Sequence, residues 1–268
     1  SFFKKTYIIN LKNIKNCFMG LRKIIKKALY NLNYKENKNY SVSGKTFLIT
    51  GASSGIGLSL TKSLLGKNKI VGEYNLNKSN LDQIHSNNLI KIKCDLSDYS
   101  DFENLRKIIS QEKIDIIINC AGTFGSNNQS IENIDFNNLI NVFKINSISI
   151  IKILQLMEKN DSARHLSKII NISSEGGSIE LNNQGNAYIY RLTKSALNSI
   201  SKNLSVDLHK RYKTEVVTID PGNVKTGMNP KGYLVAEKCS EYILNLVFDK
   251  KNDINGKFLN LKKKEIPW

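Results

Sequence analysis

Two residues whose types and spacing could do chemistry, Tyr190 and Lys194, lie four positions apart in the sequence. In a helix, positions i and i+4 lie on one face, so the phenol and the ammonium group can face the same space. A nearby cation favours the phenolate and lowers a tyrosine pKa from about 10 toward neutrality, where the hydroxyl can exchange a proton. The same spacing is also typical of an exposed helix face, because Tyr and Lys are common in this sequence. The pair therefore needs support from other segments.

A glycine-rich segment provides the first support. The apolar run 44–50 predicts a strand, residues 58–65 predict a helix, and between them lies Gly51-Ala52-Ser53-Ser54-Gly55-Ile56-Gly57. Glycines allow the backbone to approach a pyrophosphate closely, and the start of the following helix offers free N–H groups and the positive end of its dipole. The sequence therefore predicts a dinucleotide site at this turn.

Strands and helices then alternate along the chain. Further strands are predicted at 69–73, 89–94, 114–119, 168–173, 215–220 and 257–261, and helices at 102–110, 142–157, 188–209 and 239–248. This alternation predicts an α/β fold, a Rossmann-type doubly wound parallel sheet of about seven strands with helices on both faces. In such a sheet ligands bind at the carboxyl ends of the strands, where the unusual residue clusters of this chain fall.

Composition limits the class of protein. The chain has 268 residues, which suggests one domain or two small ones, and its 40% hydrophobic residues fit a globular protein. Its four cysteines are scattered without a Cys-x-x-Cys pair, which indicates neither a disulfide frame nor a metal site and favours the cytoplasm. No apolar run reaches the roughly eighteen residues of a transmembrane helix. A bias toward Asn, Lys and Ile runs through the chain, so we expect no nucleic-acid partner despite the net charge of +17.

The charge is concentrated in an N-terminal extension, residues 1–43, which precedes the predicted catalytic domain at 44–268. The extension has ten Lys or Arg and one acid, so it carries 10 − 1 = +9 of the total. Apolar residues recur at helical spacing from Leu11 to Leu32, which predicts a basic amphipathic helix, and a polar linker follows. Three interpretations remain open: peripheral contact with an anionic membrane or a partner, an organelle-targeting peptide, or a helix packed on the domain.

From about Lys45 onward the chain resembles the short-chain dehydrogenase/reductase family. The motifs that carry the resemblance follow the family's order: the segment from Thr50 to Gly57, Asp95-Leu96, Asn119-Cys120-Ala121-Gly122, Asn146, Ser173-Ser174, Tyr190 with Lys194, and Pro221-Gly222 followed by Thr226. The segments 174–179 and 188–191 and the ending Glu265-Ile266-Pro267-Trp268 are similar to the C-factor-like branch.

The resemblance implies four catalytic residues. Tyr190 would be the general acid or base, Ser174 would hold the substrate oxygen, with Ser173 as the alternative, and Lys194 would bind the nicotinamide ribose and tune Tyr190. Asn146 would relay protons through water behind Lys194. The implied cofactor, NAD or NADP, would contact Gly51, Ser53, Ser54, Gly55, Ile56, Gly57, Asp95, Leu96, Asn119, Ala121, Gly122, Tyr190, Lys194, Pro221, Gly222 and Thr226.

Several of these residues have plainer interpretations. Asp95 is also a candidate helix cap, and Asn119 is a candidate structural tie between strands. The cofactor preference stays open, because the positions that select NAD or NADP read Glu73-Tyr74-Asn75: Glu73 favours NAD and the nearby Lys78 favours NADP. The segment 226–237 is short for one that covers a substrate, which predicts an open pocket.

Two functions follow as hypotheses. The first is an NAD(P)-dependent oxidoreductase that interconverts a carbonyl and a secondary alcohol, with a small-molecule substrate and a homodimer or homotetramer formed through the two long helices. The second is a cofactor-binding signalling or scaffold module without important turnover, tethered by the basic N-terminal extension. The convergence of Ser174, Tyr190 and Lys194 favours the enzyme.

Overall fold

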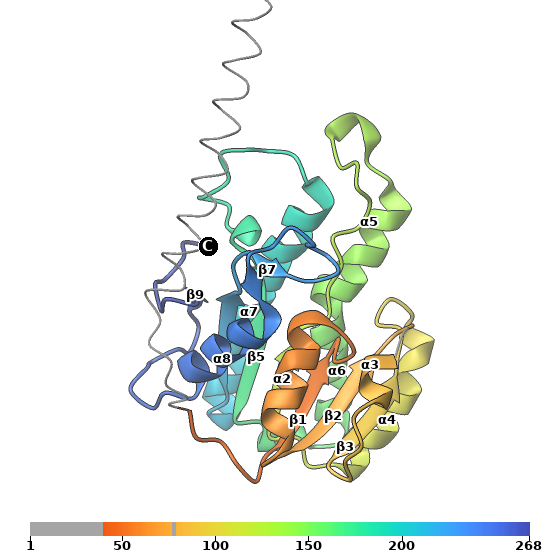
Figure 1. Ribbon diagram of the computed structural model, residues 1–268, viewed down its shortest axis with the longest axis vertical. Helices are drawn as coiled ribbons and strands as arrows, with labels where there is room; N and C mark the ends of the chain where they lie inside the picture. Colours follow the sequence, from red (N-terminus) through yellow and green to blue (C-terminus); the bar gives the residue numbers. More distant parts are fainter. Residues whose placement is uncertain (1–39, 77–78) are drawn as a thin grey trace, which may run out of the picture. The chain divides into compact units, whose positions relative to one another are not determined.

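The computed structural model describes residues 40–76 and 79–268, which form one parallel sheet of seven strands with helices on both faces (Figure 1). The strands are β1 (Thr46–Thr50), β2 (Lys69–Tyr74), β3 (Leu89–Lys93), β4 (Ile116–Asn119), β5 (Lys168–Ile172), β6 (Glu215–Asp220) and β9 (Phe258–Asn260). They lie in the order β3-β2-β1-β4-β5-β6-β9, with each neighbouring pair parallel. The strand order reverses between β1 and β4, which creates a crevice at their carboxyl ends. The predicted doubly wound sheet is confirmed.

Alternating apolar side chains on the strands build two cores, one on each face of the sheet. Leu48, Ile117 and Ile169 belong to the cluster formed with α4 (Phe102–Gln111), α6 (Ser149–Lys159) and α7 (Tyr188–Tyr212). The residue before Leu48 on β1, Phe47, faces the other side and meets the ring of Phe248, which follows α8 (Ala236–Val247). Figure 1 shows α8 and α2 (Gly55–Leu65) in front of the strands. Because both faces are covered, the strands read as nearly continuous apolar runs.

The predicted helix at 142–157 is longer than expected and contains one wide turn. It begins as α5 (Phe136–Phe143), passes through a π-helical turn (Lys144–Ile148) and continues as α6. The Asp135 carboxylate caps its start by accepting from the N–H groups of Asn137 and Asn138. The span 136–159 is long and apolar enough to cross a membrane, but its residues Ile150, Ile153 and Met157 are buried in the core. We therefore assign it as a core helix.

Several smaller elements were not predicted, three of which are a helix and two strands. The helix α3 (Ser79–Asp82) follows β2, and a short parallel pair of strands, β7 (Val224–Lys225) and β8 (Leu234–Val235), follows β6. Strand β7 begins four residues after β6 ends, so the pair holds the segment 226–237 close to the carboxyl ends of the main strands. Strands of two residues carry no sequence periodicity that could reveal them.

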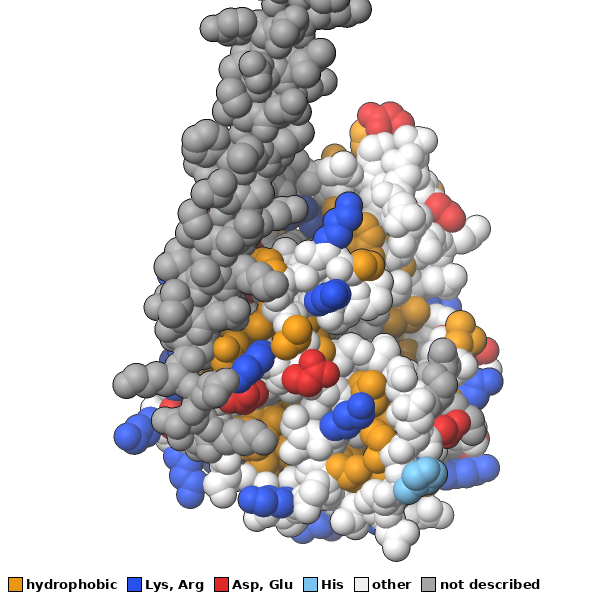
Figure 2. Space-filling view, in the orientation of Figure 1, with side chains coloured by type: hydrophobic (Ala, Val, Ile, Leu, Met, Phe, Trp, Pro, Cys, Tyr) orange, Lys and Arg blue, Asp and Glu red, His pale blue; other side chains and the backbone are white. Residues whose placement is uncertain are grey.

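The surface of the described residues carries scattered charge. On the face shown in Figure 2, lysine and arginine side chains lie singly among polar and apolar ones. Ion pairs such as Lys69–Glu112 (2.7 Å) and Arg106–Glu103 use part of this charge. The basic amphipathic helix predicted between Leu11 and Leu32 lies outside the described residues, so its role stays a prediction.

Candidate active site

A cavity of about 530 Å³ lies at the carboxyl ends of β1, β4, β5 and β6. Most residues predicted for the site line it: Gly51, Ser54, Gly55, Ile56, Gly57, Ala121, Gly122, Ser174, Tyr190, Lys194, Pro221, Gly222 and Thr226. The cavity thus joins the glycine-rich turn to the Tyr190–Lys194 pair, although more than a hundred residues separate them in sequence.

The glycine-rich turn is built so that only glycine fits at two positions. Gly51 has a φ of +67°, and a Cβ there would lie 2.9 Å from Ala121 Cα. A Cβ on Gly57 would lie 2.2 Å from the Gly51 carbonyl oxygen. Helix α2 starts at Gly55, within this turn, with no side-chain cap and no acid in its first turn. Its first N–H groups and positive dipole end therefore suit an anion such as a pyrophosphate.

Lys194 is buried at the floor of the cavity, with 5% of its surface exposed. Its Nζ donates to the carbonyl oxygen of Ile172 at the end of β5 (2.9 Å) and lies 6.0 Å from the centroid of the Tyr190 ring. Burial lowers the pKa of the Lys194 ammonium to about 8. The predicted sharing of one helix face by Tyr190 and Lys194 agrees with this geometry.

The Tyr190 hydroxyl lies beside the Ser174 side chain. Burial raises the pKa of Tyr190, the interaction with Ser174 opposes this effect, and the Asp220 carboxylate adds to it. The expectation that Lys194 lowers the Tyr190 pKa toward neutrality is therefore wrong for the site as described, because desolvation is the larger effect. Tyr190 is a neutral phenol here, a form that can donate a proton.

The two neighbouring serines have different partners. Ser173 is buried and its Oγ donates to Asn198 Oδ1 (2.7 Å), whereas the Ser174 Oγ accepts from Gly176 N (3.1 Å) beside Tyr190. Ser174 is therefore the serine available to a substrate oxygen, and the alternative, Ser173, has a structural partner.

Asn146 lies behind the cavity, in the π-helical turn, and is fully buried. Its Oδ1 accepts from Thr123 N (2.8 Å), and its Nδ2 donates to Thr123 O (2.9 Å) and to Thr193 Oγ1 (3.0 Å). A Cβ on Gly122 would lie 3.4 Å from Asn146 Oδ1 and 3.6 Å from Lys194 Nζ, so both groups border this glycine. The side chain of Asn146 thus ties the loop after β4 to α7.

Four other predicted cofactor residues do not line the cavity. Asn119 Oδ1 accepts from Thr50 Oγ1 (3.2 Å), and Thr50 Oγ1 accepts in turn from the N–H groups of Cys120 and Ala121, so Asn119 ties β4 to β1. The Asp95 carboxylate accepts from Ser97 N (2.8 Å) within its own turn, and Leu96 is buried in the core. Ser53 offers its carbonyl to Asn80 Nδ2 (3.1 Å). For Asn119 the plainer interpretation describes the observed contacts, whereas Asp95 is not a helix cap, because Asp98 and Asp101 stand at the starts of the helices that follow it.

Glu73 occupies a position that neither interpretation of the cofactor preference foresaw. It is buried, with 1% of its surface exposed, and its Oε2 accepts from the Gly51 N–H (2.9 Å) under the glycine-rich turn. The carboxyl faces the protein interior, so the structure does not support the interpretation that Glu73 selects NAD. Lys78, the residue that favours NADP, lies outside the described residues.

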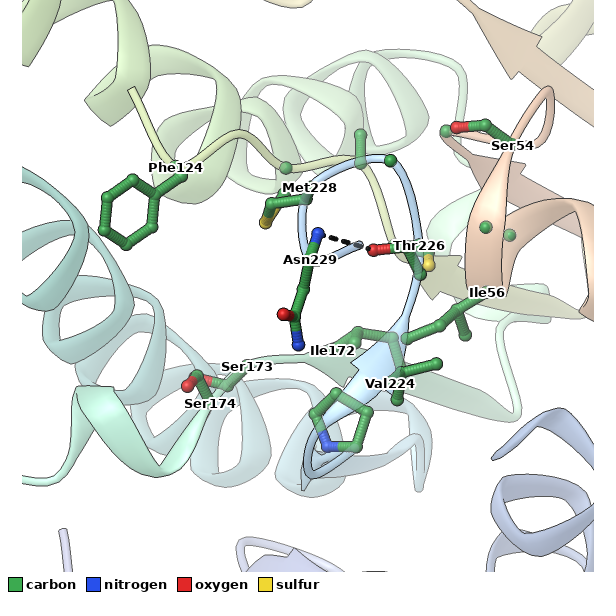
Figure 3. A pocket seen from close by; sticks show the side chains of 18 of the residues that line it. Ser54, Ile56, Phe124, Ile172, Ser173, Ser174, Val224, Thr226, Met228 and Asn229 are labelled. Carbon is green, nitrogen blue, oxygen red and sulfur yellow. Dashed lines mark hydrogen bonds between the residues drawn. The ribbon is translucent and has the colours of Figure 1, made fainter. Parts of the chain in front are cut away.

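The segment from Thr226 to Asn229 forms part of the cavity wall. Figure 3 shows this turn between Phe124 at one side of the cavity and Ser54 and Ile56 at the other, with Asn229 N donating to Thr226 Oγ1 (3.3 Å). Sequence reasoning missed Phe124, Met228 and Asn229 as lining residues. Only their place after the strands β4 and β6 could have indicated them, because their residue types are uninformative in loops.

Comparison with known proteins identifies the family of this chain. A family model described as short chain dehydrogenase matches residues 45–233. A 3-oxoacyl-[acyl-carrier-protein] reductase of Rickettsia conorii is 33% identical over 77% of this chain and 82% of its own length. The C-signal protein of Myxococcus xanthus is 28% identical over 58% of this chain and 93% of its own length.

Solved structures agree on the fold. The carbonyl reductase Sniffer of D. melanogaster has a TM-score of 0.74 and 26% identity, covering 84% of this chain and 99% of its own. An NADPH-bound carbonyl reductase from chicken fatty liver has a TM-score of 0.75 and 23% identity, and the match covers 85% of this chain and 100% of the reductase. With the family model and the Rickettsia relative, these findings show that the chain belongs to the short-chain dehydrogenase/reductase family.

Proposed function

We propose that this protein is an NAD(P)-dependent oxidoreductase that interconverts a carbonyl and a secondary alcohol on a small molecule. One observation carries the proposal: the side chains of Tyr190 and Ser174 lie beside each other in the lining of the cavity, and the Lys194 ammonium lies beside the Tyr190 ring. Two hydroxyls that meet at one point can hold a carbonyl oxygen and give it a proton as it becomes an alcohol.

The proposed roles follow from these positions. Ser174 orients the substrate oxygen, and Tyr190 donates the proton in reduction or accepts it in oxidation. The buried Lys194 ammonium stabilises the phenolate that Tyr190 becomes after donation, when its charge matters most. Asn146 keeps the relay role that the resemblance implies, although its three side-chain bonds go to Thr123 and Thr193 and give it a clear structural task.

The residues present fit a dinucleotide. Gly51 and Gly57 let the backbone pack closely where α2 begins, and no acid in the first turn of α2 repels a pyrophosphate. Lys194 and Thr226 would hold the nicotinamide end. When bound, NAD(P) supplies the hydride, and the chain supplies position and proton transfer.

NADP(H) is our preferred cofactor. The acid that would reject a 2′-phosphate, Glu73, is buried against Gly51, and the half-buried residues that follow it, Tyr74 and Asn75, are neutral. A titration of NADPH and NADH by their fluorescence decides the point. Binding of NADPH tenfold tighter supports this preference, and tighter NADH binding contradicts it.

The turnover test uses the full chain with each cofactor and three carbonyls of different class: 4-nitrobenzaldehyde, ethyl acetoacetate and cyclohexanone. We expect oxidation of NADPH with at least one of them at a rate that Tyr190→Phe abolishes. Cofactor binding without turnover of any member of a widened panel would favour the second hypothesis, a signalling or scaffold module.

We also propose a homodimer or homotetramer formed through α5, α6 and α7. Large apolar side chains on these helices are exposed on the described chain, among them Phe136 (73%), Ile140 (53%), Leu192 (45%) and Val206 (59%). Apolar groups gathered on two long neighbouring helices are typical of a surface that another subunit covers.

A further inference from the structure

Gln129 is a buried polar residue for which the proposed mechanism has no use. It lies in the loop that leads from β4 to α5, and 3% of its surface is exposed. Its Nε2 donates to the carbonyl oxygens of Phe124 (2.7 Å) and Ser126 (2.9 Å), and its Oε1 accepts from the backbone N–H of Tyr190 (3.0 Å). Both amide hydrogens and the carbonyl are therefore bonded, which fixes the orientation of this side chain.

The start of α7 lacks an ordinary cap. Ala187, the residue before the helix, is in the left-handed region (φ 51°) with no side chain that could accept, and Asn186 before it is also left-handed (φ 57°). The first intrahelical bond of α7 runs from Arg191 N to Ala187 O, so the N–H of Tyr190 has no partner within the helix. Gln129 supplies that partner from a segment sixty-one residues away.

The other end of the Gln129 amide holds the residue that packs on the Tyr190 ring. The centroids of the Phe124 and Tyr190 rings lie 5.1 Å apart, and Phe124 also lines the cavity. Gln129 therefore ties the backbone of Tyr190 and the backbone of Phe124, and through Phe124 it supports the plane of the phenol ring. A tilt of α7 at its first turn would move the Tyr190 hydroxyl away from Ser174.

We propose that Gln129 is a positioning residue that sets where the Tyr190 hydroxyl lies relative to Ser174 and Lys194. This inference rests on the proposed function, because it assigns Gln129 a task in the same proton transfer. Misplacing a reacting group by about 1 Å can lower a rate on the order of 100-fold. Gln129 does not contact the glycine-rich turn, so the affinity for NADP(H) should stay unchanged when the rate falls.

Two variants separate the two ends of the amide. Gln129→Met keeps the volume and loses all three hydrogen bonds. Gln129→Glu keeps an acceptor for the Tyr190 N–H but turns a carboxylate toward the carbonyl oxygens of Phe124 and Ser126. The control is Gln111→Met, a change of the same type at an exposed residue at the end of α4.

Steady-state kinetics with NADPH and the best carbonyl of the panel form the first measurement. We expect kcat to fall 10- to 100-fold in Gln129→Met and about tenfold in Gln129→Glu, with the KM for NADPH within threefold of wild type and Gln111→Met unchanged. A kcat within threefold of wild type in both Gln129 variants would overturn the proposal. If Gln129→Met does not fold, the Gln129→Glu result decides alone.

Amide hydrogen exchange at Tyr190 is the second measurement, and it needs no turnover. The exchange should be at least tenfold faster in Gln129→Met and unchanged in Gln129→Glu. Equal exchange rates in the wild type and Gln129→Met would contradict the role of Gln129 as the hydrogen-bond partner that protects the Tyr190 N–H. A wild-type protein that reduces none of the carbonyls would contradict the proposed function, whereas the exchange result still decides whether Gln129 holds the start of α7.

Discussion

Replacing Glu73 with Gln should stabilise the fold increasingly as the pH rises. The Glu73 carboxyl is 1% exposed and accepts from the Gly51 N–H. Burial raises its pKa from 4.5 to about 8; the Gly51 N–H opposes this shift, and the Asp95 and Asp101 carboxylates add to it. Because the pKa is higher in the folded state, the proton is held more tightly there than in the unfolded chain.

The sign and size of the effect follow from these two pKa values. The stability that the protonated Glu73 contributes is fully present below pH 4.5 and is lost as the pH rises toward 8. At about 1.36 kcal/mol per pH unit, the loss relative to low pH reaches about 3 kcal/mol at pH 7 and roughly 5 kcal/mol at pH 9. Glutamine keeps an acceptor for Gly51 and never ionises, so Glu73→Gln avoids this loss.

Urea unfolding of both proteins at pH 5, 7 and 9 measures the effect. The free energy of unfolding of wild type should fall relative to that of Glu73→Gln across this range. Glu103→Gln, at an exposed carboxylate paired with Arg106, is the control and should run parallel to wild type. If the free energy of unfolding of wild type and of Glu73→Gln changed equally from pH 5 to 9, the Glu73 carboxyl would not be buried and neutral under the glycine-rich turn.

Three further predictions concern other parts of the chain. Gly57→Ala should lower the free energy of unfolding by roughly 1–3 kcal/mol and remove most of the affinity for NADPH, because its Cβ would lie 2.2 Å from the Gly51 oxygen. The control Gly66→Ala, whose Cβ would have no atom within 4 Å, should leave thermal unfolding and the NADPH titration unchanged. Light scattering should give a dimer or tetramer at micromolar concentration that Ile140→Lys with Leu192→Glu dissociates, and a monomeric wild type would contradict the proposed interface. The full chain should co-sediment with anionic vesicles and dissociate from them as the salt concentration rises, whereas a chain starting at Ser43 should not bind. If the shortened chain loses thermal stability and the full chain does not bind vesicles, the predicted N-terminal helix belongs to the packed domain.

The fold and the centre of the site could be predicted because their signals are local. The turn from Gly51 to Gly57 and the Tyr190–Lys194 spacing depend on residues close in sequence, and the apolar strands read directly as a parallel sheet. The strand ends differ from prediction by a few residues, because hydrogen bonding to neighbours decides where pairing stops.

The remaining features depend on contacts between distant segments. Gln129 reaches Tyr190 across sixty-one residues, and Phe124 meets the Tyr190 ring from a loop whose path has no periodic signal. The pKa of Tyr190 was predicted in the wrong direction because spacing gives the nearby charge but does not give the depth of burial. Glu73 was considered as a residue that favours NAD for the same reason, since its type suggests exposure and its position on β2 buries it.

The most direct test of the central proposal is the reduction of a carbonyl by Tyr190→Phe. This variant removes only the hydroxyl that meets Ser174, and the ring keeps its packing against Phe124. We predict that kcat falls by about 10²- to 10⁴-fold, the contribution typical of a general acid, and that the dissociation constant for NADPH stays within threefold of wild type. A Tyr190→Phe protein that keeps a tenth or more of the wild-type rate would contradict the proton-transfer role of Tyr190.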